Sequence, residues 1–153
     1  MPTECSAPTT RNARSARTRR LSGLAAVALG VVLLTGCLSE EGQRSFDLIN
    51  QERTSRGIHA LVNDADMNAT AQAWAEHMVA VNRLYHSTLR IPPGATRVAE
   101  NVGYGGSVDS IHGRLMASTG HRNNILDARM TRVGIGSATG PDGRVWIVQL
   151  FAN

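Results

Sequence analysis

The chain has 153 residues, with 16 arginines, 12 acidic residues, no lysine and a formal net charge of +4. This length suits one ordinary domain. Five arginines and Glu4 precede residue 37, and the eleven arginines that follow are scattered singly among eleven acids. Because a nucleic-acid partner requires clustered cations, this balance excludes nucleic acid from the expected partners.

The first 37 residues have the form of an export signal that ends in a lipidation site. A segment with five arginines precedes an apolar run over 21–34. As a helix this run would reach about 21 Å, short of the roughly 30 Å hydrocarbon core of a membrane. Leu34-Thr35-Gly36-Cys37 then matches a bacterial lipoprotein cleavage box. The pattern predicts a signal peptide rather than a membrane-spanning helix.

We therefore expect residues 1–36 to be a lipoprotein signal peptide and Cys37 to carry diacylglycerol. The mature protein would then be anchored by lipid on the extracytoplasmic face of the cell membrane. Two alternatives stay open, namely a secreted protein with a free Cys37 thiol and export by the twin-arginine route, for which Arg19-Arg20 is the signal. Cys5 leaves with the signal peptide, so the mature domain has no thiol for a disulfide or a cysteine-based metal site.

Residues 37–44 are expected to be the acylated Cys and a short polar linker, and two helices are predicted in the first half of the mature chain, the first of which begins within this segment. Ser39 with two acids behind it is typical of a helix start and Gly57 of a helix end, which predicts a helix over about residues 40–56. Its buried residues are expected to be Phe46, Ile49 and Leu48. A second helix, capped by Asp64, is indicated by an apolar stripe with a 3.6-residue period. That stripe consists of Met67, Ala71, Trp74, Met78 and Val81.

The second half of the chain mixes strands with shorter helices. A loop over 87–97 leads to a strand near 98–104, and Ser107 begins a third helix that bends or stops at Gly120. One or two helical turns over 121–128 are followed by two alternating segments, 132–138 and 145–152, with turn-forming residues between them. The order predicts an α+β fold in which helices cover a small antiparallel sheet.

Three segments place a histidine or an acid at the boundary of an element: Tyr85-His86-Ser87, Ala99-Glu100-Asn101 and Gly120-His121-Arg122. Two histidines and a carboxylate in one cleft could hold a divalent metal, or one histidine could act as acid or base near neutral pH. The structural alternative is that His86 pairs with Glu100 to fix a loop while His121 caps a helix. The spacing leaves these readings open.

Taken together, the segments resemble the CAP superfamily, also called the SCP domain, which includes pathogenesis-related class-one proteins, venom antigens and bacterial envelope proteins. The resemblance covers about residues 44–153, and we place the domain at 45–153. In family order the matching pieces are Leu48-Ile49-Asn50-Gln51-Glu52-Arg53, the helix over 71–78, Tyr85-His86-Ser87, Ala99-Glu100-Asn101-Val102-Gly103, Gly120-His121-Arg122 with Asn124-Ile125-Leu126, Val133-Gly134-Ile135-Gly136, and Trp146-Ile147-Val148-Gln149-Leu150-Phe151.

The resemblance implies an α-β-α sandwich with a cleft lined by two histidines and two acids. By motif, His86 and His121 match the histidines and Glu100 the first acid. The second acid of the eukaryotic branch is missing, because Ser118 or Thr119 stands in its place. This departure weakens any mechanism that needs two carboxylates and leaves open a metal site made by His86, Glu100 and His121.

The sequence therefore predicts a lipid-anchored extracytoplasmic domain whose cleft binds a lipid, a cell-wall fragment or an envelope partner, with zinc or another divalent metal as the only cofactor considered. The alternative is a metal-dependent, peptidase-like hydrolase of the cell envelope, so enzymatic activity stays open. His59, His77 and His112 match no motif and are expected to be surface histidines or hydrogen-bonded boundary histidines.

Overall fold

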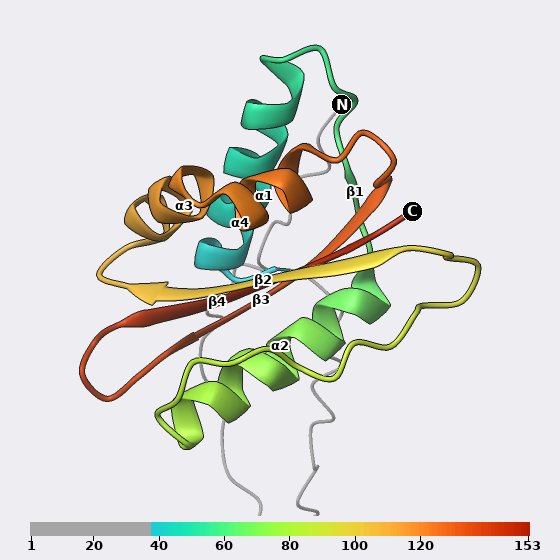
Figure 1. Cartoon of the computed structure of the whole chain (residues 1–153). Coiled ribbons are helices and arrows are strands. Elements are labelled where there is room, and N and C mark those ends of the chain that lie inside the picture. Colours follow the sequence, from blue (N-terminus) through green and yellow to red (C-terminus); the bar gives the residue numbers. More distant parts are fainter. Residues whose placement is uncertain (1–37) are drawn as a thin grey trace, which may run out of the picture. The chain divides into compact units, whose positions relative to one another are not determined.

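The computed structural model describes residues 38–153, and the predicted signal peptide (1–36) and Cys37 lie outside them. In chain order the elements are α1 (Glu40–Thr54), β1 (Val62–Asn63), α2 (Ala65–Ala80), β2 (Val98–Gly105), α3 (Val108–Ala117), α4 (Thr119–Leu126), β3 (Arg132–Thr139) and β4 (Val145–Ala152). Figure 1 shows α2 on one face of the sheet and α1, α3 and α4 on the other. The expected α-β-α sandwich of the α+β class is confirmed. Within the described residues no helix is long and apolar enough to cross a membrane.

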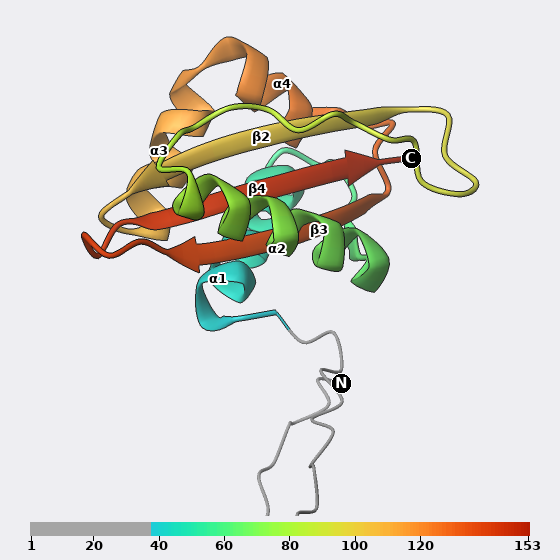
Figure 2. The ribbon, with the colours of Figure 1, turned by 90° about the horizontal axis from the view of Figure 1, so that it is seen from below.

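The sheet has the strand order β1-β3-β4-β2. The β3–β4 hairpin and the β2–β4 pair are antiparallel, as expected, whereas β1 pairs with β3 in parallel through Val62 and Asn63. This fourth strand makes the sheet mixed and was not predicted, because two residues give no alternation that a sequence pattern can show. Figure 2 displays β3, β4 and β2 side by side with α2 across them.

The starts of α1 and α2 follow the predicted capping residues, whereas α1 ends two residues before the expected residue 56 and α4 spans Thr119–Leu126 instead of 121–128. Ser39 accepts a hydrogen bond from the Gly42 N–H, and Asp64 accepts from two amides at the start of α2. The third helix ends earlier than the predicted stop at Gly120. Ser118 adopts an extended conformation (φ −86°, ψ 123°) and separates α3 from α4.

Each face of the sheet carries its own hydrophobic core. The core under α1, α3 and α4 is made of Ile49, Leu61, Val108, Ile111, Leu115, Ile125, Met130, Val133, Ile135, Ile147 and Phe151. The core under α2 is made of Met67, Ala71, Ala75, Met78, Val102, Trp146, Val148, Leu150 and Ala152. The predicted stripe of α2 is therefore correct except at Val81, which follows the helix and is exposed.

Two glycines in β3 let α2 lie directly on the sheet. A Cβ at Gly134 would fall 2.3 Å from the carbonyl carbon of Met67, and a Cβ at Gly136 would fall 2.2 Å from that of Ala71. These contacts are with main-chain atoms, so no side-chain rotation could relieve them. The Val-Gly-Ile-Gly segment thus sets the distance between helix and sheet.

Arg53, at the end of α1, is fully buried. Its shortest hydrogen bonds all go to main-chain carbonyl oxygens. It donates to the carbonyl oxygens of His59 at 2.9 Å, Ile125 at 2.8 Å, Asp127 at 3.0 Å and Met130 at 3.1 Å. The guanidinium joins α1 to the end of α4 and the loop beyond it. Arg53 is therefore a structural residue that fixes the helix carrying His121.

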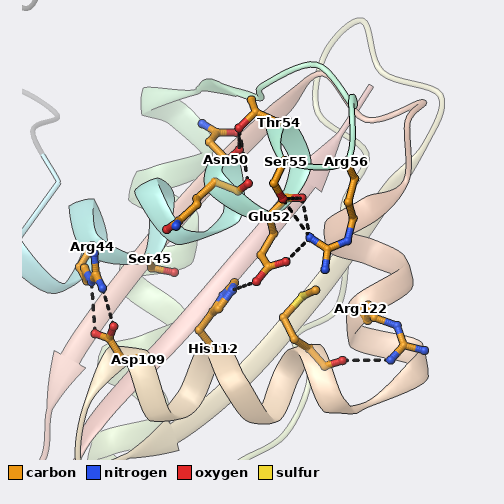
Figure 3. Close-up of polar contacts among 12 residues, drawn as sticks. Arg44, Ser45, Asn50, Glu52, Thr54, Ser55, Arg56, Asp109, His112 and Arg122 are labelled. Atoms are coloured by element: carbon orange, nitrogen blue, oxygen red, sulfur yellow. Dashed lines mark hydrogen bonds and ion pairs between the residues drawn. The ribbon is translucent and has the colours of Figure 1, made fainter.

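Helices α1 and α3 meet through ionisable side chains, shown in Figure 3. Arg44 pairs with Asp109 at 2.5 Å, and His112 Nε2 lies 3.7 Å from Glu52 Oε1. Neither ring nitrogen of His112 has a hydrogen-bond partner among residues 38–153, and the side chain is buried. The prediction of a surface or hydrogen-bonded boundary histidine is wrong for His112, because it lies inside the α1–α3 interface.

Candidate functional site

Glu100 is the buried centre of the candidate site. It lies in β2 with 1% of its side chain exposed, and its Oε1 accepts the Ser87 N–H at 2.9 Å while its Oε2 accepts the Ser87 hydroxyl at 2.6 Å. His86 Nδ1 lies 2.7 Å from the same Oε1, and the histidine side chain is 57% exposed. With an ionised carboxylate as acceptor, Nδ1 carries the proton and Nε2 is left free. Glu100 therefore orients His86 towards solvent with a defined free nitrogen.

His121 reaches the same place from α4, on the other side of β2. Its ring centroid lies 6.4 Å from that of His86, with the rings inclined at 31°. Burial, and then the charge of His86, lowers the pKa of His121. A neutral imidazole near neutral pH is the form that can accept a proton or bind a metal.

A network of buried amides holds the main chain at His121. Asn101 Nδ2 donates to the His121 carbonyl oxygen at 3.1 Å and to Gln149 Oε1 at 3.1 Å. Asn124 donates to Asn101 Oδ1 at 2.9 Å, and Gln149 donates to Ser45 Oγ at 3.0 Å. Sequence reasoning gave these amides no role. The available signal was an amide at an otherwise apolar strand position, as in the Ile147–Phe151 run around Gln149.

The two histidines fit a shared metal ion only after a small movement. A zinc ion lies about 3.2 Å from the centroid of an imidazole that binds it, so tetrahedral angles would put two such rings about 5.2 Å apart. The observed 6.4 Å would have to close by about 1 Å. Glu100 supplies no third ligand in this arrangement, since its side chain is 1% exposed and its oxygens face Ser87 and the Nδ1 side of His86.

In agreement with this geometry, residues 38–153 contain no group of three or more His, Cys, Asp and Glu side chains placed to hold a metal. The position of Glu100 behind His86 is instead that of an outer carboxylate, which in metal sites orients a ligating histidine through its other nitrogen. The residues thus fit an open site with two imidazole ligands, the remaining positions being left to water or ligand.

A groove of about 490 Å³ runs along the outer edge of β2 next to His121. Its walls are largely apolar, with Leu84 on one side and Ile111 and Leu115 of α3 on the other. Arg114 and His121 are the lining residues that can carry a positive charge, and no Asp or Glu side chain of the described chain lines it. The groove can therefore enclose an apolar or extended ligand whose polar end meets a cation or an imidazole.

Ser118 and Thr119, which stand where the missing acid is expected, lie in different environments. Ser118 lines the groove together with His121, while Thr119 begins α4 and is exposed. The structure thus brings His86, Glu100, His121 and Ser118 to one region and leaves Thr119 at the surface. Cys37, the predicted lipidation site, lies outside the described residues.

Known structures with this architecture come from bacteria and animals. An outer surface protein from Borrelia burgdorferi superposes with a TM-score of 0.67 at 14% identity, over 75% of this chain and 93% of that one. An extracellular SCP-domain protein from Bacillus anthracis gives a TM-score of 0.61 at 24% identity, over 74% of this chain but only 40% of that one. NaASP2, solved with Zn²⁺, gives a TM-score of 0.59 at 13% identity, over 76% of this chain and 81% of that one.

Identities this low establish the fold alone, and no curated protein matches the chain. The family rests on the sequence itself. Residues 46–151 match the model of the cysteine-rich secretory protein family, abbreviated CAP. Since this match spans the two histidines, Glu100 and most of the chain, the protein belongs to the CAP family.

Proposed function

We propose that this CAP domain is a lipid-anchored binding module on the extracytoplasmic face of the membrane, whose ligand lies in the groove beside His86 and His121. The observation that carries the proposal is the groove itself, which combines apolar walls with the imidazole of His121 and has no acidic lining residue among residues 38–153, while the ring of His86 lies 6.4 Å from that of His121. The ligand classes it suits are a lipid, a cell-wall fragment or an envelope partner. The extracellular and outer-surface relatives in Bacillus and Borrelia support the location.

Ligand entry can be followed through Trp146. Its ring stacks on the groove residue Tyr104 with centroids 4.7 Å apart, so a ligand against Tyr104 should alter the emission of Trp146. In a Trp74→Phe background this is the remaining tryptophan. Titration with a fluorescence-silent fatty acid and with soluble cell-wall fragments should give a saturable change with one of them. No change with either probe would contradict the proposal.

Two leucines provide a matched pair for locating the binding site. Leu84 lines the groove and Leu89 does not, yet their exposures are 39% and 40%. Leu84→Glu should weaken binding of the active probe at least about tenfold, because it places a charge in the apolar wall. Leu89→Glu should leave binding unchanged. Equal effects of the two changes would place the ligand elsewhere.

We further propose that the imidazole pair takes a divalent metal, with zinc as the leading candidate. The free Nε2 of His86 and the lowered pKa of His121 support this assignment, as does the zinc-bound relative NaASP2. The metal would supply a positive charge at the end of the groove. Calorimetry at about pH 7.5 should detect zinc binding that weakens as pH falls through the histidine range. Loss of the heat in His86→Ala, but not in His77→Ala, would locate the ion.

A further inference from the structure

The outward main-chain groups of β3 and of β2 differ in how many hydrogen bonds they make. On the outer edge of β3, Ile135 N–H donates to Asn68 Oδ1 at 2.8 Å, and Ser137 exchanges two hydrogen bonds with the side chain of Gln72 at 3.0 and 2.8 Å. Both amides come from α2, and β1 pairs with Arg132 and Val133 of the same strand. Three of the four outward main-chain groups of Ile135 and Ser137 are therefore already bonded, which leaves little for a further strand to pair with.

Within residues 38–153, side chains bond to two of the outward carbonyl oxygens of β2. Ile135 of β3 lies opposite Gln149 of β4, and Gln149 lies opposite Asn101 of β2. Because the Ile135 N–H points away from β4, Gln149 bonds to Asn101 on its other side. The main-chain groups of β2 alternate in direction, so those of Glu100, Val102 and Tyr104 point away from β4. Side chains from α3 and α4 take two of the outward carbonyls. Asn124 donates to the Glu100 oxygen at 3.3 Å, and Arg114 donates to the Tyr104 oxygen at 2.5 Å.

Val102, between these two capped positions, is left unpaired. Its outward N–H and C=O make no hydrogen bond to any group within residues 38–153. The residue is only 6% exposed and lines the groove. Buried main-chain groups are nearly always paired, so an unpaired N–H and C=O at the floor of a groove point to a ligand that carries the complementary acceptor and donor.

The groove is lined by four consecutive residues of β2, Val102–Gly105. Gly103 and Gly105 flank Tyr104 and present no side chain towards α3, where a Cβ at Gly103 would fall 2.8 Å from Ile111. One residue of an antiparallel strand could take both the N–H and the C=O of Val102. The neighbouring side chains of such a strand would reach the apolar walls on either side.

The charges of the lining residues determine which extended peptides suit the groove. The lining side chains that can carry a positive charge are Arg114 and His121, and the described lining contains no carboxylate. Glu100 is nearby but buried, with both oxygens bonded to Ser87 and His86. A peptide with acidic side chains is therefore complementary to the groove, whereas a basic peptide meets the guanidinium and the imidazole.

We propose that the groove binds an acidic peptide segment in extended conformation, which adds to β2 as an edge strand by pairing with the main chain of Val102. This assignment rests on the proposed function, since it names the ligand class of the same groove. Strand addition takes its affinity from main-chain hydrogen bonds and its specificity from pockets for alternate side chains. Val102 supplies the former, and Leu84, Leu115 and Arg114 supply the latter.

The test uses the lipid-anchored protein in nanodiscs and an octapeptide of alternating aspartate and valine. At saturation, amide hydrogen exchange of Val102 should slow by at least about tenfold, because its N–H becomes bonded. The Ile135 amide on the opposite edge is already bonded to Asn68 and should not change. The matching lysine–valine peptide should bind at least about tenfold more weakly. Unaltered exchange at Val102, or equal binding of both peptides, would overturn the assignment.

Two further experiments are needed. The first distinguishes hydrogen bonding of the peptide to Val102 from mere covering of Val102, and the second distinguishes failure of the peptide assignment from failure of the proposed function. In an extended peptide, amides of aspartate and valine face opposite sides, so N-methylation of only one of the two sets should abolish protection of Val102. Retained protection with both methylated peptides would refute strand addition. If the peptide fails while a fatty acid still perturbs Trp146 in wild type but not in Leu84→Glu, the binding module stands and the peptide assignment falls.

Discussion

His112 Nε2 lies 3.7 Å from Glu52 Oε1, across the α1–α3 interface, too far for a hydrogen bond. Burial is the largest influence on His112 and lowers its pKa, while Glu52 opposes this shift. The native state therefore disfavours protonation of His112 relative to the unfolded chain. The contribution of neutral His112 to the free energy of unfolding is therefore present in full above the ordinary histidine pKa of 6.5, and it is lost as the pH falls through the lowered pKa of the folded state.

We expect the free energy of unfolding to decrease between about pH 7 and about pH 5, and His112→Leu to reduce that decrease. The shifted pKa of His121 acts in the same direction, so the pH dependence should shrink rather than vanish. Urea denaturation at both pH values measures the effect. Gly113→Ala, in the same helix as His112, changes no titratable group, so it serves as control and should keep the wild-type pH dependence. If His112→Leu leaves the pH dependence of the free energy of unfolding unchanged, the α1–α3 interface tolerates a protonated imidazole.

Gly136→Ala should be one of the most destabilising single changes in the chain, by about 3 kcal/mol or more, because overpacking against main chain cannot relax. The new Cβ would meet the carbonyl carbon of Ala71 at 2.2 Å. Gly113→Ala is the matched control, since nothing lies within 4 Å of its Cβ and it sits inside α3. That change should stabilise by about 0.5–1 kcal/mol through helix propensity. Thermal unfolding of both variants checks the opposite signs.

The sequence predicted the helices and the long strands because each has a period or a cap that local chemistry sets. Asp64 and Ser39 are caps by side-chain chemistry alone, and β3 and β4 alternate around a turn-forming segment. β1 escaped prediction, since its two residues are held by pairing with β3 rather than by their own pattern. The burial of His112 escaped as well, because it depends on how α1 crosses α3.

The site was predicted as a set of residues and not as a geometry. Family resemblance brought His86, Glu100 and His121 together, but it could not indicate that Glu100 points at Ser87 and His86 instead of into the space between the rings. The open position at Val102 is likewise a property of sheet topology. No residue type reveals which strand lies at an edge.

Glu100→Gln tests the outer-carboxylate role. The amide keeps the volume but removes the negative charge, so the Nδ1–H of His86 is left with a neutral and weaker acceptor. We expect zinc affinity to fall by about 10- to 100-fold, the usual effect of removing an orienting partner of a ligating histidine. Glu76→Gln, at an exposed site on α2, is the control for calorimetry. Zinc affinity unchanged by the first substitution would mean that Glu100 serves the fold alone.

Cys37→Ser tests localisation. One acyl chain binds membranes marginally, whereas the diacylglyceryl group of a lipoprotein supplies two and gives stable anchoring. We expect the variant to lose metabolic labelling with palmitate and either to leave the membrane fraction or to stall before signal cleavage. Cys5→Ser, within the predicted signal peptide, should label and fractionate normally. Undiminished membrane retention of Cys37→Ser would contradict lipid anchoring.

The last prediction is that the protein does not hydrolyse peptides or esters, with or without zinc. A two-carboxylate mechanism would need an acid near Ser118, and no acid of the described chain lines the groove there. Asp109, the nearest preceding acid in sequence, is exposed and paired with Arg44 at 2.5 Å. Glu100 cannot serve two roles, because its oxygens already hold His86 and Ser87.

Turnover of a fluorogenic peptide and of an activated ester should therefore equal that of His121→Ala within error. Each added catalytic group is worth about 10²–10⁴ in rate, so a complete site would be plain against this variant. Hydrolysis that wild type shows and His121→Ala lacks would make the hydrolase alternative the better account. In that case His86, held by Glu100 with its Nε2 free, would be the first residue to test as general base, through the pH profile of His86→Gln.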